Sequence, residues 1–450
     1  MQRDAIDFGR TSVPQLFVRL FIPTLTGLLF GSLLNVTDGI FVGRGVGSDA
    51  LAAVNIVAPL FLLTTGVVLM FASGVSIVAA IHLSKGNVKA ANINVTQALT
   101  IPFVLIALLL SVVVLMPREV TILFGGSERL VPYVTDYLRC AAIGILMCVP
   151  LFVGMFVVRL DGSPNFAMMV NIINSLLNIG LDYLFVFPLE MGIKGAAIAT
   201  SMASTVSALV MMGYFVFRSR QIRFYHPKFS HKAIRLTMRN AGYMVKLGVS
   251  TFLGETALSC MMIVGNYMFM SRLQEDGVAA FSVACYLFPL VFMVGNAIAQ
   301  SALPIISYNH GLGRHDRIAH TFRLSMTVAA TAGTLITLLG IFGGHLLAGL
   351  FLEPGIHSWE IAAQGLPLYA LSFVFFTLNL VLIGYYQALE KPQPATVFML
   401  LRGYVLIIPI FIILPNIFGD EGLWLATPIS EALTFIVIVG YYLRKKTLIR

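Results

Sequence analysis

The sequence predicts an all-α integral membrane protein whose twelve transmembrane helices form two pseudo-symmetric six-helix bundles with a central cleft. Hydrophobic residues make up 58% of the 450 residues and charged residues only 11%, and the mean hydropathy is +0.90. Apolar runs of about 20 or more residues, the length that a helix needs to cross a bilayer, recur along the chain. The two halves of the chain also resemble each other in sequence.

Twelve apolar runs are each long enough to cross roughly 30 Å of hydrocarbon as a helix. We expect them at 16–43, 51–83, 96–116, 132–158, 165–188, 193–217, 245–271, 279–309, 321–351, 362–388, 396–416 and 423–443. With the N-terminus placed inside, 23 of the 29 Lys and Arg residues fall on the cytoplasmic side, Arg402 among them. Both termini are therefore predicted to be cytoplasmic. Topology thus accounts for the net charge of +9 without nucleic acid as a partner, although a lipid-binding patch at 218–240 is an alternative.

An internal repeat relates the two halves at an offset of 228 to 230 residues. FVGRGVGSDALAAVNI from Phe41 aligns with FMSRLQEDGVAAFSVA from Phe269, and MGIKGAAIAT aligns with EGLWLATPIS. Because an even number of helices separates the copies, both halves enter the membrane in the same direction, as in transporters with parallel repeats. We expect an N-terminal lobe at 1–217, a basic cytoplasmic linker at 218–244 and a C-terminal lobe at 245–450.

Four acidic residues lie well inside the predicted spans: Asp38, Asp182, Glu255 and Glu431. A carboxylate at mid-bilayer costs at least about 2.5 to 3.5 kcal/mol, so each needs a partner, a cavity or a proton. Glu431, near a helix end or bundle contact, is interpreted as structural. Asp38 shares a helix face with Asn35, three residues before it. Pro23 removes a backbone hydrogen bond earlier in the same helix and predicts a kink.

The span at 165–188 carries a polar stripe. Its members follow one another at steps of three, four and four residues, which places them on one helix face: Asn171, Asn174, Asn178 and Asp182. Asn171, near the end of the span, is interpreted as a contact between helices. Asn178 and Asp182 are functional candidates, because an ionisable group inside the membrane is one by default.

Thr200, on the next helix, completes a set of hard oxygen ligands with Asp38, Asn178 and Asp182, and Asn35 and Asn174 are candidate supporting groups. Such a set can hold Na⁺ or share a proton. Two carboxylates close together in a low dielectric do not both stay charged unless a cation or a proton binds. Ion binding would therefore change the local charge and could shift the first helix between two arrangements.

These residues resemble the multidrug and toxic compound extrusion (MATE) family, in particular its prokaryotic DinF-like and MepA-like branch. The resemblance covers nearly the whole chain and rests on TDGIFVGRGVGSDALAA in the first helix and after it, RLDGSPNFAM before the fifth helix, and the basic middle loop. It implies a secondary antiporter of the prokaryotic cytoplasmic membrane that exports organic, mostly cationic compounds and drugs against inward H⁺ or Na⁺ flow. We expect a monomer with no cofactor beyond the coupling ion. The resemblance also implies a bending proline, Pro23, and an N-lobe cation site formed by Asp38, Asn178, Asp182 and Thr200.

The second half has diverged, since Asn266 occupies the repeat position of Asp38. Glu255 resembles a membrane glutamate of this branch, and two roles stay open for it: contact with cationic substrates, or a second ion site. Methionine and aromatic side chains can form a pliable cavity for flat cations. The candidates for lining it are Phe269, Phe288, Met293, Tyr369 and Phe373.

Other functions have less support in the sequence. The chain contains no Gly-Lys dipeptide, so it has no phosphate-binding loop for an ATP-driven pump. None of the eight histidines is followed by Glu, and with no other motif chemistry a membrane enzyme is a remote alternative. A lipid-linked saccharide flippase of the same superfamily is the closer alternative. Such proteins more often have fourteen spans and a basic cavity, whereas the charges inside the predicted spans are acidic, which favours cations.

Overall fold

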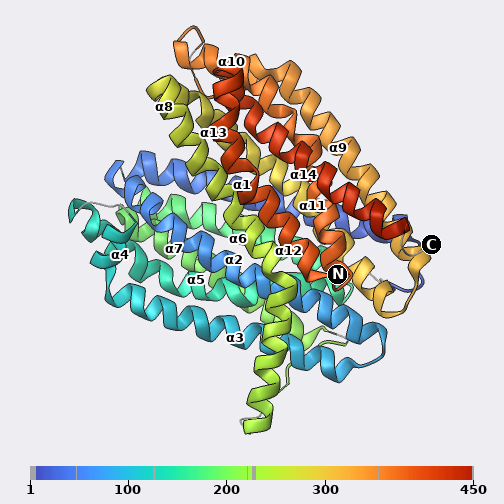
Figure 1. Ribbon diagram of the computed structural model, residues 1–450. Coiled ribbons are helices and arrows are strands. Elements are labelled where there is room, and N and C mark those ends of the chain that lie inside the picture. Colours follow the sequence, from blue (N-terminus) through green and yellow to red (C-terminus); the bar gives the residue numbers. More distant parts are fainter. Residues whose placement is uncertain are drawn as a thin grey trace. The chain divides into compact units, whose positions relative to one another are not determined.

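The structure is a computed structural model that describes residues 7–46, 48–124, 128–219, 221–225, 230–352 and 354–447. Within these ranges the side chains of 35, 36, 38–40, 43–45, 48, 49, 51, 52, 55, 232, 275 and 445–447 are not described. The described residues form helices joined by short turns and contain no strand (Figure 1). Twelve of these helical segments are long and apolar enough to cross a membrane, which confirms the predicted fold class.

The chain divides into two compact units. The first comprises Met1–Phe252 and Ser307–Arg314, and the second comprises Leu253–Ile306 and His315–Arg450. The helices that lie wholly in the first unit are α1 (Val13–Gly45), α2 (Ser48–Ser84), α3 (Val88–Leu115), α4 (Pro117–Leu123), the short 3₁₀ helix η1 (Glu128–Leu130), α5 (Val131–Leu160), α6 (Pro164–Val186) and α7 (Gly192–Phe217). Six of them, all except α4 and η1, correspond to predicted spans.

Within the first unit, α1 packs on α6, α6 on α7 and α7 on α5, and α2 and α3 also pack on α5. Gly144 of α5 lets α7 come close, because a Cβ atom at this position would lie only 2.6 Å from the Cα of Ser201. The Ser201 hydroxyl donates a hydrogen bond to the Cys140 carbonyl at 2.6 Å. These contacts fix the position of α7 along the axis of α5.

Helix α8 (His231–Gly311) carries the seventh and eighth spans. Gln274 interrupts it with a non-helical backbone (φ 54°, ψ −147°), and this break separates the two spans. Residues 231–252 belong to the first unit. There the Gln97 amide donates to the Thr237 hydroxyl at 2.9 Å and accepts from the Asn240 amide at 3.0 Å. The predicted linker at 218–244 thus includes the start of α8, at His231.

Side-chain and backbone hydrogen bonds hold the segment after α7 on the first unit. Asp161, in the turn between α5 and α6, accepts hydrogen bonds from the Tyr214 hydroxyl at 2.7 Å and the Ser219 hydroxyl at 3.0 Å. Farther along, the Arg223 N–H donates to the Asn92 side chain of α3 at 3.1 Å. The described residues 219 and 221–225 therefore follow the surface of the first unit.

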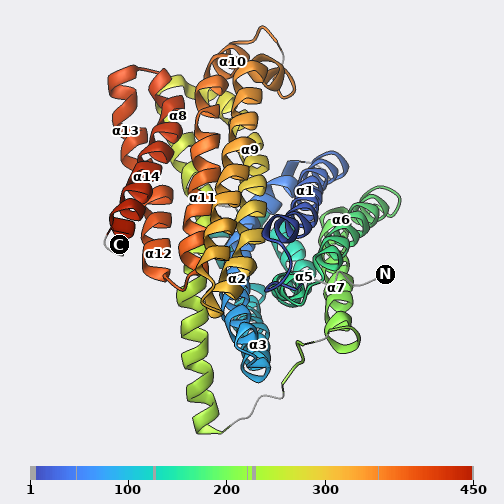
Figure 2. The same ribbon diagram turned by 90° about the vertical axis from the view of Figure 1, so that its right-hand side faces the viewer.

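The second unit contains the later part of α8 with α9 (His315–Gly349), α10 (His357–Ala370), α11 (Ser372–Ala388), α12 (Pro392–Leu400), the π-helical turn η2 (Leu401–Val405), α13 (Ile407–Phe418) and α14 (Glu421–Thr447). Helices α9, α10 and α11 pack together, and α14 packs on α11 and α13 (Figure 2). An aromatic core holds the unit, with the Phe269 and Phe281 rings stacked at 4.6 Å and Trp424 edge-on to Phe269 at 4.9 Å.

Candidate functional site

The polar stripe predicted for the fifth span lies on α6. Asn178 and Asp182, one turn apart, are each only 1% exposed. The side-chain oxygens of Asn174 and Asn178 are buried and accept no hydrogen bond from the described residues. An amide oxygen that is buried without a donor leaves its desolvation uncompensated, and a bound cation would compensate it.

Asn171, one end of this stripe, joins α6 to α1. Its amide donates a hydrogen bond to the Gly27 carbonyl at 2.7 Å, the role between helices that its position near the end of the span indicates. The stripe thus divides into a packing residue at one end and the deeply buried pair, Asn178 and Asp182, at the other.

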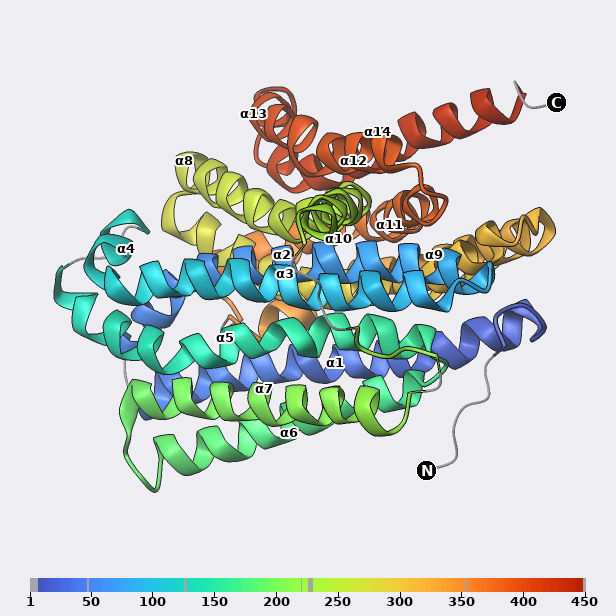
Figure 3. The ribbon, with the colours of Figure 1, turned by 90° about the horizontal axis from the view of Figure 1, so that it is seen from below.

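The register of α1 against α6 places the backbone of Asp38 near that of Asp182. The two helices run in the same direction (Figure 3). Asp38 lies eleven residues beyond Gly27, and Asp182 lies eleven residues beyond Asn171, so each rises about 16 Å from the same contact at 1.5 Å per residue. Phe41, one turn after Asp38, contacts the ring of Tyr183 at 6.4 Å, which supports this register.

The structure describes only some of the predicted residues of the first helix in full. The side chains of Asp38 and Asn35 lie outside the described part of the structure, although the backbone of both is helical. Pro23 is buried inside α1, where its ring leaves the Arg19 carbonyl without its usual helical donor. The predicted bending of this helix stays a prediction.

Thr200 reaches the same site from α7. The Asn178 amide donates to the Thr200 hydroxyl at 3.2 Å, so the amide nitrogen faces α7 and the amide oxygen is left as an acceptor. Ser201, the next residue, holds α7 on α5 through the bond to the Cys140 carbonyl. This contact between α7 and α5 therefore also fixes the position of Thr200.

The described part of this N-lobe site offers a carboxylate, an amide oxygen and a hydroxyl. Hard oxygen ligands of this kind suit Na⁺, and the carboxylate suits a proton. No group of three or more His, Cys, Asp or Glu side chains able to hold a metal ion is found among the described residues.

The predicted cavity residues of the second half lie at different depths. Phe288 lines a pocket in the second unit. Phe269, Tyr369 and Phe373 belong to the hydrophobic core of the same unit, and Met293 is half-buried. Glu255 on α8 is half-buried and makes no hydrogen bond or ion pair with the described residues, so both roles considered for it stay open.

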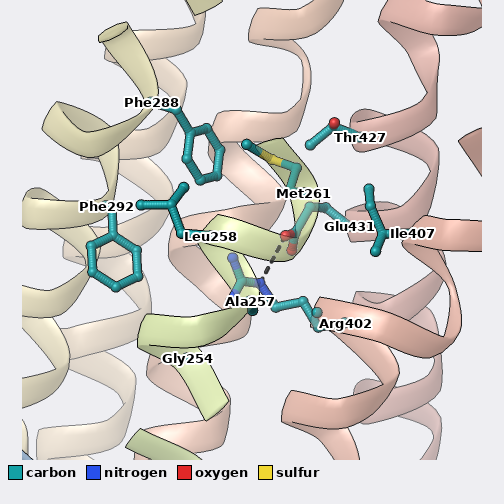
Figure 4. Close-up of a pocket in the computed structure, with 11 residues that line it drawn as sticks. Gly254, Ala257, Leu258, Met261, Phe288, Phe292, Arg402, Ile407, Thr427 and Glu431 are labelled. Atoms are coloured by element: carbon teal, nitrogen blue, oxygen red, sulfur yellow. Dashed lines mark hydrogen bonds and ion pairs between the residues drawn. The ribbon is translucent and has the colours of Figure 1, made fainter. Parts of the chain in front are cut away.

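The pocket beside Phe288 contains a buried ion pair (Figure 4). The Arg402 Nε donates to the Glu431 Oε1 at 2.7 Å, and the two side chains are 6% and 5% exposed. The Asn379 amide donates to the Glu431 Oε2 at 2.8 Å and to its carbonyl at 2.9 Å. The guanidinium also lies over the Phe376 ring, 4.2 Å from its centroid. Glu431 thus has a partner for each carboxylate oxygen.

This ion pair corrects two expectations. Arg402 was assigned to the cytoplasmic side, but the eleventh span covers Pro392–Phe418 and Arg402 is buried within it. Consequently the charges inside the spans are not all acidic. The predicted span at 396–416 was too short at its start, and this error placed the arginine near a helix end, where snorkelling is inexpensive. The sequence feature that could have indicated this ion pair is an Arg and a Glu in successive spans, because opposite charges inside a membrane usually pair.

Comparison with known proteins shows the family. The family model MatE matches residues 23–184 and 251–413, once in each half of the internal repeat. The FAD transporter of Shewanella oneidensis is 25% identical over 449 residues, covering 97% of this chain and 96% of that protein. The multidrug export protein MepA of Staphylococcus aureus is 22% identical over 458 residues, covering 98% and 96% respectively.

Solved structures share the fold. A mutant of the Vibrio cholerae MATE transporter VcmN superposes with a TM-score of 0.89 at 20% identity, covering 97% of this chain and 98% of that chain. A MOP superfamily transporter of Pyrococcus furiosus, described as having a binding pocket of reverse polarity, gives a TM-score of 0.87 at 21% identity and covers 98% of both chains. Since the family model matches well over half of the residues, the chain belongs to the MatE family, the transporters that its sequence motifs resemble.

Proposed function

We propose that this protein is a secondary active exporter of small organic compounds, mostly cationic ones, driven by inward movement of H⁺ or Na⁺ across a prokaryotic cytoplasmic membrane, with both termini in the cytoplasm. The observation that carries the proposal is the buried oxygen set of the first unit. The Asn178 amide of α6 meets the Thr200 hydroxyl of α7, Asp182 is buried one turn farther along α6, and α1, which carries Asp38, packs on α6.

The coupling follows from the cost of buried charge. Without a bound ion, Asp38 and Asp182 would place two negative charges in one low-dielectric region, and a proton or Na⁺ removes part of that repulsion. Helix α1 carries one of these carboxylates and is held to α6 by the Asn171–Gly27 hydrogen bond. Binding and release of the ion can therefore favour two arrangements of α1. An organic cation that competes for the same negative charge would be released when the ion binds.

The names of the relatives support export of organic solutes rather than membrane enzymology. MepA is a multidrug export protein, and the Shewanella relative is an FAD transporter. Flippase activity toward lipid-linked saccharides has no comparable support among the relatives named above. The twelve described spans also differ from the fourteen expected more often of such flippases.

The proposal is tested in proteoliposomes by following ethidium export under an imposed pH gradient and, separately, under an imposed sodium gradient. We expect one of the two gradients to drive export. Asp38→Asn and Asp182→Asn should each reduce that export to the level of empty liposomes while leaving the amount of folded protein unchanged. The control is Asp420→Asn, at an exposed position between α13 and α14, which should export normally.

Two outcomes would contradict the proposal. If neither gradient drives ethidium export by the wild-type protein, it is not an antiporter of this kind. If the wild type exports but either variant in the first unit exports equally well, coupling does not depend on the N-lobe carboxylates.

A further inference from the structure

The second unit contains a small pocket that the N-lobe mechanism does not use. Its volume is about 20 Å³, measured as the space open to the centre of a water molecule. Apolar side chains form most of its wall, and Figure 4 shows the Arg402 side chain entering among Leu258, Phe292 and Glu431. A space of this size holds about one water molecule. In this conformation the pocket is therefore closed to any larger guest.

The hydrogen bonds of the ion pair leave Arg402 with spare donors. A guanidinium has five N–H groups. One N–H, on Nε, donates to Glu431 and one on Nη1 faces the Met399 sulfur at 3.6 Å, which leaves three without an acceptor among the described residues. Phe376 covers a face of the guanidinium, so a guest in the pocket would meet the remaining N–H groups at an edge. Because Arg402 lines the pocket, these N–H groups are available to an acceptor that enters it.

The π-helical turn η2 supports this interpretation. Arg402 is its second residue, and π-helical turns are rare and occur frequently at functional sites. Gly403 allows the turn to pack on α8, because a Cβ atom at 403 would lie only 2.5 Å from the Cβ of Ala257. The backbone at η2 is thus held in place, and Arg402 is directed into the bundle.

We propose that Arg402 binds the carboxylate or phosphate group of a transported organic anion with an aromatic body. The Nη1–Nη2 edge presents two parallel N–H donors, the geometry that matches an oxyanion. Glu431 keeps the Nε–H and both Asn379 contacts, so it stays paired when the guest arrives. The aromatic body would displace the flexible Leu258 and Met261 side chains and pack against Phe288 and Phe292. Transport of the bound anion rests on the proposed function, whereas its binding does not.

The test compares two flavins that share a ring system and differ by one phosphate, riboflavin and FMN. Binding to the purified full-length protein is followed by flavin fluorescence anisotropy without any ion gradient. We expect FMN to bind about 10- to 100-fold more tightly than riboflavin, from charge-assisted hydrogen bonds to the phosphate. Arg402→Lys keeps a positive charge for Glu431 but removes the two-donor edge, so it should reduce this preference about tenfold and leave riboflavin affinity unchanged.

Three controls make the result decisive. Arg118→Lys, at an exposed position on α4, should keep the FMN preference. The melting temperature of Arg402→Lys should stay close to that of the wild type, which excludes unfolding as the cause of lost binding. Inorganic phosphate at the FMN concentration should fail to displace FMN, which separates an organic anion from free phosphate.

Equal affinity for the two flavins, no detectable binding of either, an unchanged preference in Arg402→Lys, or displacement by free phosphate would each overturn the proposal. A protein that prefers FMN but fails to export ethidium under either gradient would retain the binding site while the proposed antiport fails.

Discussion

The buried pair of Arg402 and Glu431 allows a double-mutant cycle whose size follows from its geometry. The Nε–Oε1 distance is 2.7 Å, and both residues are more than nine-tenths buried. Removing one member of such a pair leaves the other charge buried and uncompensated, so Arg402→Met and Glu431→Gln should each lower the free energy of unfolding by about 3 to 5 kcal/mol. The double variant removes both charges and should lie within about 2 kcal/mol of the wild type.

Thermal unfolding measures this cycle in detergent. The second unit spans about 190 residues, for which 1 kcal/mol corresponds to roughly 2 to 4 °C, so each single variant should melt about 6 to 20 °C lower. Trp359 and Trp424, the only two tryptophans of the chain, both lie in this unit and report its unfolding by fluorescence. The double variant should recover most of the loss. Two results would refute a strongly coupled buried pair. One is a melting temperature of the single variants equal to that of the wild type, and the other is a decrease in the double variant equal to the sum of the two single decreases.

Two further predictions concern the packing of the first unit. Gly144→Ala would place a methyl group 2.6 Å from the Ser201 Cα; it should separate α5 from α7 and reduce gradient-driven ethidium export at least severalfold, whereas Gly180→Ala, where a Cβ atom meets nothing within 4 Å, should export normally. Tyr214→Phe removes a hydrogen bond to Asp161 worth about 1 kcal/mol; it should speed tryptic cleavage after position 223, and cleavage at the wild-type rate would show that this bond does not hold the segment.

The number and approximate positions of the spans were predictable, because each depends on a long apolar run and not on long-range contacts. The polar stripe on α6 was also predictable, since its spacing alone fixes one helix face. Asn171 and Asn178 lie about equally far from the two ends of α6 and differ in their contacts: Asn171 bonds the Gly27 carbonyl of α1, and Asn178 is 1% exposed.

Contacts between distant segments were not predictable in this way. Polar and basic residues at 231–244 indicated a linker, but they continue a helix whose Thr237 and Asn240 bond Gln97, 140 or more positions earlier. The hydropathy of a segment does not show which neighbour satisfies its polar groups. Arg402 was misplaced for a related reason. Its burial depends on a carboxylate in the next span, and a single-helix pattern contains no information about that partner.

The two halves of the repeat have kept their helices and redistributed their buried charges. Alignment of MGIKGAAIAT with EGLWLATPIS sets Ser201 of α7 opposite Glu431 of α14. In the first unit the serine bonds a carbonyl of α5, and the buried carboxylate lies instead near the end of α6, at Asp182. In the second unit the matching position itself carries the carboxylate, which an arginine neutralises. An ion binds most strongly at a carboxylate that no permanent positive charge neutralises. Arg402 already neutralises Glu431, so an ion gains less by binding there. This difference supports the proposals that ion coupling occurs in the first unit and that Arg402 of the second unit recognises an anionic group.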